Sequence, residues 1–109
     1  MISLQIRTRH IFDQSITIGE FDPSADGAYR NVKVFPLSVR SGKLYVSVES
    51  DKPVDIALSD EDGTCIKFKN SILCDTLGPI DIAKKGTVAL LAGVFRGDKA
   101  ELRIRAWMG

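Results

Sequence analysis

Leu44-Tyr45-Val46-Ser47-Val48 decides how this chain folds, because apolar and polar residues alternate in it one by one. The same alternation returns in Leu102-Arg103-Ile104-Arg105-Ala106. Successive side chains of an extended strand point to opposite faces, so alternation gives each strand an apolar face and a polar face. Short runs of this kind, separated by turn residues, are typical of antiparallel sandwiches and barrels. The sequence therefore predicts an all-β fold, a single antiparallel β-sandwich that is jelly-roll-like.

The length and composition suit one soluble globular domain that spans residues 1–109. The 44% of hydrophobic residues and 27% of charged residues exclude a disordered chain. A net charge of +1 gives no overall field that would attract nucleic acid or a membrane. No secretory signal precedes the first predicted strand, which favours a cytoplasmic protein. An extracellular location is the alternative if the chain is a domain of a secreted parent.

Turn residues divide the chain into nine expected strands, with breaks at Asp51-Lys52-Pro53 and Lys69-Asn70 among others. These strands cover Ile2–Thr8, Ile11–Ile18, Asn31–Val39, Lys43–Glu49, Val54–Ser59, Thr64–Lys69, Ile72–Asp75, Gly86–Phe95 and Lys99–Trp107. Alternation within them predicts the core residues, which are Ile2, Leu4, Ile6, Val32, Val34, Leu44, Val46, Val48, Val54, Ile56, Leu58, Ile66, Phe68, Val88, Leu90, Leu102 and Ile104.

The segment Val88–Phe95 departs from the alternation, because its residues are apolar on both faces of the expected strand. It is too short to cross a membrane as a helix, which needs about 20 apolar residues. Either this strand lies centrally and is covered on both sides, or one face contacts another chain. In the second case Leu91 and Phe95 are candidate interface residues, with another protein or a second copy as the partner.

Part of the chain resembles a known group of domains. The resemblance rests on the run Phe35–Val48, the Asp51-Lys52-Pro53-Val54-Asp55 strand with its Asp60–Gly63 turn, the Gly86-Thr87 strand and the last strand. This segment, from about Val34 to Trp107, is similar to the pre-peptidase C-terminal domain and the Golgi-dynamics (GOLD) domain. Both are small jelly-roll-like sandwiches that act as interaction modules. The chain departs from their pattern at Val88, where an aromatic residue usually follows Gly-Thr.

Cys65 and Cys74 would lie opposite each other if Lys69-Asn70 were a two-residue hairpin turn. Such a non-hydrogen-bonded pair brings the Cα atoms to about 4.5 Å, within reach of a disulfide. The alternative is two reduced cysteines that act as small apolar residues. With a single distant histidine they do not form a zinc site.

The clearest hint of a ligand is a set of arginines at alternate positions, Arg7 with Arg9 and Arg103 with Arg105. The spacing places each pair on one face of a strand, and Trp107 aligns with the second pair. If the first and last strands are neighbours, these residues could bind carbohydrate or an anionic polymer. The alternative is a solvated strand face.

Other motifs predict turns. Asp60-Glu61-Asp62-Gly63 lacks the spacing of a calcium-binding loop, and Arg96-Gly97-Asp98 suits a hairpin. No catalytic set, cofactor site or metal site can be nominated around the single histidine, His10. We therefore expect a non-catalytic protein-interaction or assembly module. A carbohydrate- or anionic-ligand-binding module is the alternative, and a small enzyme is less favoured.

Overall fold

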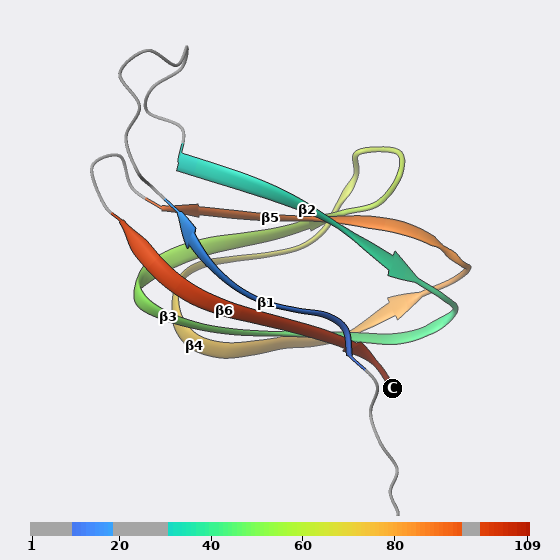
Figure 1. Ribbon diagram of the computed structural model, residues 1–109. Helices are drawn as coiled ribbons and strands as arrows, with labels where there is room; N and C mark the ends of the chain where they lie inside the picture. Colours follow the sequence, from blue (N-terminus) through green and yellow to red (C-terminus); the bar gives the residue numbers. More distant parts are fainter. Residues whose placement is uncertain (1–9, 19–30, 95–98) are drawn as a thin grey trace, which may run out of the picture.

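The computed structural model describes residues 10–18, 31–94 and 99–109, and nearly all of these form antiparallel strands (Figure 1). No helix occurs in these ranges, so none there is long and apolar enough to cross a membrane. The predicted all-β class is confirmed. The strands are β1 (His10–Ile18), β2 (Asn31–Val39), β3 (Gly42–Ser59), β4 (Cys65–Ile82), β5 (Gly86–Val94) and β6 (Ala100–Met108).

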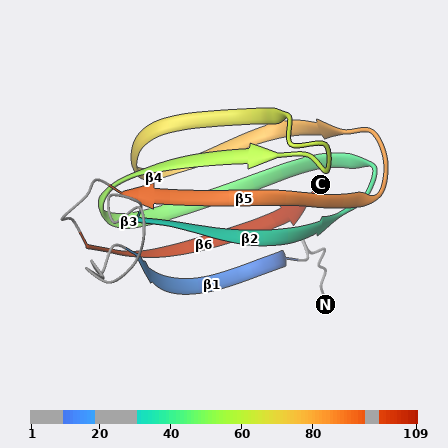
Figure 2. The same ribbon diagram turned by 90° about the horizontal axis from the view of Figure 1, so that it is seen from above.

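Two long strands, β3 and β4, pair along their whole length and bend together, which gives the molecule two layers (Figures 1 and 2). The first half of β3 pairs with β6, and its second half pairs with β5. We call the layer of β1, β6 and residues 42–50 and 74–82 the β1 sheet. The layer of β2, β5 and residues 54–59 and 65–72 is the β2 sheet. The apolar side chains between these layers form the core.

The bend in β3 lies where the sequence predicts a turn. Pairing with β6 ends at Ser50, and pairing with β5 begins at Asp55. Between them, the Ser50 hydroxyl donates to the carbonyl of Lys52 at 2.6 Å, and Pro53 has no amide hydrogen to donate. The predicted strands on either side of this break are therefore one bent strand. The signal for an interruption was correct, but it marks a change of layer and not a reversal of the chain.

Among the described residues, 21 hydrophobic residues are buried in the core, and the predicted inward faces of β3, β5 and β6 are confirmed. Three predicted core residues are wrong. Val32 and Val34 are 49% and 58% exposed, and Phe68 is 56% exposed. In β2 apolar residues occupy both faces, and the register turns Leu37 inward instead. Phe68 lies opposite Ala57, beside an irregularity in the β3–β4 pairing, and points outward. Ile2, Leu4 and Ile6 lie outside the described residues.

Candidate interaction surfaces

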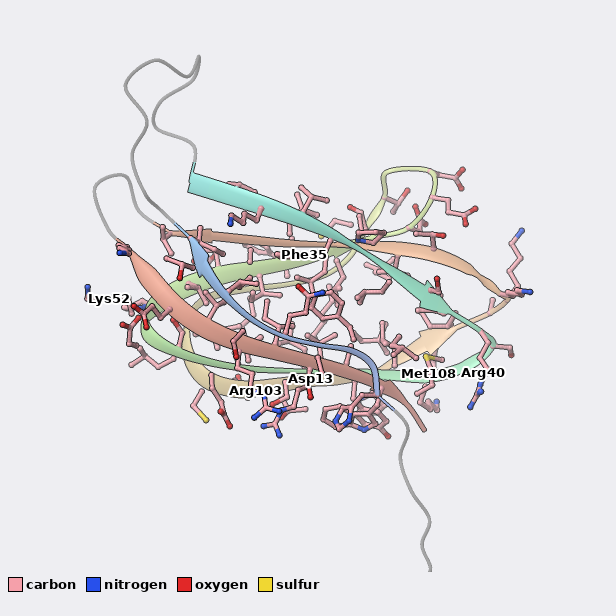
Figure 3. All side chains as sticks on the ribbon, in the orientation of Figure 1. Asp13, Phe35, Arg40, Lys52, Arg103 and Met108 are labelled. Carbon is pink, nitrogen blue, oxygen red and sulfur yellow. The ribbon has the colours of Figure 1, made fainter. Side chains whose placement is uncertain are left out.

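The outer face of the β1 sheet carries the predicted arginine pair of the last strand. Arg103, Arg105 and Trp107 alternate along β6 with buried residues, so all three belong to this face. β6 also pairs with β1, the first described strand. Each arginine already has a carboxylate partner there. Nε and Nη2 of Arg103 each donate to an oxygen of Asp13 at 3.0 Å (Figure 3). Nη2 of Arg105 donates to Glu49 at 3.1 Å.

These ion pairs change the electrostatic character that the sequence suggested. The hydrogen bonds from Arg103 lower the pKa of Asp13, and the same contact raises the pKa of Arg103. Both partners therefore keep their charges near neutral pH, and the charges balance. The basic patch stays a prediction, but Arg103 and Arg105 are paired with carboxylates from strands that only the fold brings alongside. Arg7 and Arg9 lie outside the described residues.

Trp107 belongs to a row of aromatic side chains that crosses the same face. Its ring stacks on Tyr45, with ring centroids 5.7 Å apart, and forms a T-shaped pair with His10, with centroids 5.8 Å apart. Tyr45 in turn covers Gly78, where an added Cβ would come within 3.1 Å of the ring. These contacts link neighbouring strands, and cross-strand aromatic pairs stabilise sheets. Sequence analysis placed Trp107 beside the arginines but missed Tyr45, because the pairing register of β3 and β6 cannot be read from either strand alone.

The outer face of the β2 sheet is different, because apolar residues continue across all of its strands. Val34 lies opposite Leu91, Leu91 opposite Ala57, and Ala57 opposite Phe68. We call these four residues the apolar row. Its two ends are the most exposed, at 58% for Val34 and 56% for Phe68, and Leu91 between them is partly exposed. The predicted interface residue Leu91 therefore points out of the sandwich, while Phe95 lies outside the described residues.

The positions on either side of the apolar row carry little charge. One flanking row consists of Val32, Gly93 and Asp55, and the other of Pro36, Ala89 and Ser59. Asp55 is the one charged residue in these rows, and its Oδ1 accepts the amide of Ser71 at 3.0 Å. Sequence analysis missed Val34, Ala57 and Phe68 as surface residues. The sequence did contain a signal for such a surface, because β2 and β5 carry apolar residues at successive positions and only every second one can point into the core.

The loop after β3 uses its carboxylates to hold its own backbone. Oδ1 of Asp60 accepts the amides of Asp62 and Thr64, both at 2.9 Å, and Gly63 adopts a φ of +83°. Glu61 accepts the amide of Thr87 at 2.7 Å and so ties this loop to the start of β5. Within residues 10–18, 31–94 and 99–109, no three His, Cys, Asp or Glu residues gather where a metal ion could bind.

The two cysteines do not face each other. β4 continues through Lys69-Asn70, so the predicted hairpin is wrong, and the bend nearby appears as a φ of +56° at Ser71. Cys65 lies opposite Ser59 and Cys74 opposite Glu49, and both are exposed free thiols. They belong to one continuous strand and lack the cross-strand pairing on which the predicted disulfide depended. The predicted disulfide is therefore wrong for this structure.

Comparison with known proteins adds little to this geometry. No protein-family profile matches the chain, and no curated protein matches it. The resemblance to the pre-peptidase C-terminal and GOLD domains stays a prediction. One solved structure, described as a Burkholderia pseudomallei antigen and type I fimbria protein, has 13% sequence identity and a TM-score of 0.45. The match covers 90% of this chain and 99% of that chain, and at this level it supports no inference about function.

Proposed function

We propose that this domain is a non-catalytic interaction or assembly module that binds a protein through the outer face of its β2 sheet. The apolar row carries this proposal. Val34 and Phe68 lie outside the core of the described residues, because more than half of the surface of each is exposed. Exposed apolar side chains that adjoin one another, and are not scattered singly, mark protein interaction sites.

The contrast between the two outer faces of the sandwich strengthens this choice. On the β1 sheet, the side chains of Arg103 and Arg105 form ion pairs with carboxylates of neighbouring strands. Alternating charges and solvated polar groups are the usual outer surface of an antiparallel sheet. The β2 sheet carries Leu91 and Phe68 in equivalent outward positions. A surface of this kind gains free energy when a partner removes it from water.

A carbohydrate or anionic ligand on the β1 sheet is the second candidate, and it has less support. Both arginines of that face already hold carboxylates, which reduces their attraction for another anion. The ring of Trp107 is in contact with Tyr45 on one side and with His10 on another. The polar and aromatic groups of these residues are therefore already engaged with one another, whereas Val34 and Phe68 of the apolar row are more than half exposed.

Photo-cross-linking in the cells that naturally make this protein tests the proposed function. Benzoylphenylalanine replaces Phe68 in one variant and Leu73 in the control, since both residues belong to β4 and are 56% and 51% exposed. We expect adducts with a defined protein from position 68, few from position 73, and loss of the adducts when Leu91→Glu is added. Equal cross-linking from both positions, or adducts that survive Leu91→Glu, would show that the β2 sheet is not the interaction surface.

A further inference from the structure

The identity of the partner can be inferred from the chemistry of the same face, an inference that rests on the proposed function. We infer that the apolar row binds the apolar row of a second copy of this chain, so that two β2 sheets stack face to face in a symmetric dimer. Three properties of the face support this occupant: its near absence of charge, its protected edges and its size.

The absence of charge favours a partner with the same surface. In the apolar row and the two flanking rows, Asp55 is the one charged residue, and its carboxylate is already bound to the amide of Ser71. A binding surface selective for a charged partner needs opposite charges in register. This face offers only Asp55, at the margin of the apolar row, so a second copy of the same face would bury mainly apolar side chains. A two-fold axis through the face would pair the same patch on both copies.

The edges of the β2 sheet favour contact through its face. Lys67 and Lys69 lie on β4, the edge strand on one side, and Lys69 forms an ion pair with Asp75. β2, the edge strand on the other side, carries Lys33 and Pro36. Lysine and proline on an edge strand discourage the addition of another strand. A partner is therefore directed to the face between these edges, where Leu91 and Ala57 lie.

The size of the face predicts a weak dimer. Four strands spaced by about 4.8 Å, with six to nine residues that rise about 3.3 Å each, cover roughly 500 Å² on each copy. Two such faces would bury about 1,000 Å² in total, which is near the lower limit for specific interfaces. Stacked sheets pack about 10 Å apart, which leaves room for Val34, Leu91 and Phe68 of both copies to interdigitate. We therefore expect a weak association in which monomers and dimers exchange.

Sedimentation equilibrium of the purified full chain tests this inference. The apparent mass of the wild type should rise with concentration from the 12.0 kDa of one chain toward twice that value. Phe68→Glu and Val34→Glu change opposite ends of the apolar row, and each residue is more than half exposed, so the monomer should stay folded. Each substitution occurs twice in a symmetric dimer, so we expect the dissociation constant to rise about 100-fold or more.

Leu73→Glu is the matched control, because Leu73 lies on β4 with similar exposure but outside the apolar row. It should leave the monomer–dimer equilibrium unchanged, and circular dichroism should show the same folded spectrum for all variants. A wild type that stays monomeric to about 500 µM would overturn the dimer. The cross-linking experiment would then still decide the proposed function, because adducts with a different protein at position 68 would support that function and exclude self-association.

Discussion

Two glycines with positive φ allow the close approach of β4 to the neighbouring strand β3 to be tested by mutation. Gly63 has a φ of +83° and Gly78 a φ of +129°, so alanine is strained at both. At Gly63 an added Cβ would meet no atom within 4 Å, whereas at Gly78 it would lie 2.6 Å from the carbonyl oxygen of Leu44 and 3.1 Å from the ring of Tyr45. Gly63→Ala therefore measures the conformational strain alone, and Gly78→Ala adds a clash with the neighbouring strand.

The expected costs follow from these contacts. A residue with a Cβ atom destabilises the folded state by about 1–2 kcal/mol in the left-handed region. Replacing glycine also lowers the conformational entropy of the unfolded chain, which stabilises the fold by about 0.4–1 kcal/mol. Gly63→Ala should therefore cost about 1 kcal/mol. At Gly78 the φ lies farther from the tolerated region, which costs about 1–3 kcal/mol, and the overpacking adds about 1–3 kcal/mol. Gly78→Ala should therefore cost about 3 kcal/mol or more.

Thermal unfolding followed by circular dichroism measures the difference. For a domain of about 100 residues, 1 kcal/mol corresponds to roughly 4 °C in Tm. We expect Gly63→Ala to lower Tm by about 4 °C and Gly78→Ala by about 12 °C or more. Equal Tm values for the two variants would contradict the close approach of β4 to Leu44 and Tyr45. Equilibrium urea unfolding provides the same comparison as free energies.

Three further predictions follow from the core, an ion pair and the cysteines. Ile56 is fully buried in the central strand, so Ile56→Ala should lower the free energy of unfolding in urea by about 2–5 kcal/mol. The hydrogen bonds from Arg103 lower the pKa of Asp13 in the folded chain. The ionised carboxylate therefore stabilises the fold above its unfolded pKa, about 4, and this stabilisation is lost as pH falls through the folded pKa. The difference in unfolding free energy between wild type and Asp13→Asn should vanish in acid. Both Cys65 and Cys74 should react with a thiol reagent in the native protein, and a two-dalton mass loss of the monomer on mild oxidation would contradict the register of β4.

Much of the fold was predictable because alternation reports which side of a strand is buried. The inward faces of β3, β5 and β6 were identified correctly from this pattern alone. The pattern failed where it was ambiguous. In β2 both faces carry apolar residues, and the choice between Val34 and Leu37 depended on how β2 pairs with β5. The sequence showed that Val88–Phe95 is apolar on both faces, but not which residues of other strands lie beside Leu91 on the outer face.

The breaks in the pattern were also visible, but their meaning was not. Asp51-Lys52-Pro53 and Lys69-Asn70 interrupt the alternation, and either can end a strand or bend it. Both belong to bends, because β3 and β4 pair with each other on both sides of the interruption. A hairpin at Lys69-Asn70 would satisfy the same local preferences. Long-range pairing decided between them, and the position of Cys65 relative to Cys74 changed with it.

The amino-acid sequence was enough to predict the all-β class, the inward faces of β3, β5 and β6 and the places where strands bend or end. These are local properties, since they depend on the alternation of side chains and on the conformations that Gly, Pro and Asp favour. Only the tertiary structure decided which strands are neighbours. That choice placed Asp13 beside Arg103 and so balanced the charge of one face, and it aligned Val34 with Leu91 and so made the other face apolar. The character of a sheet surface depends on register between distant segments, which no single strand encodes.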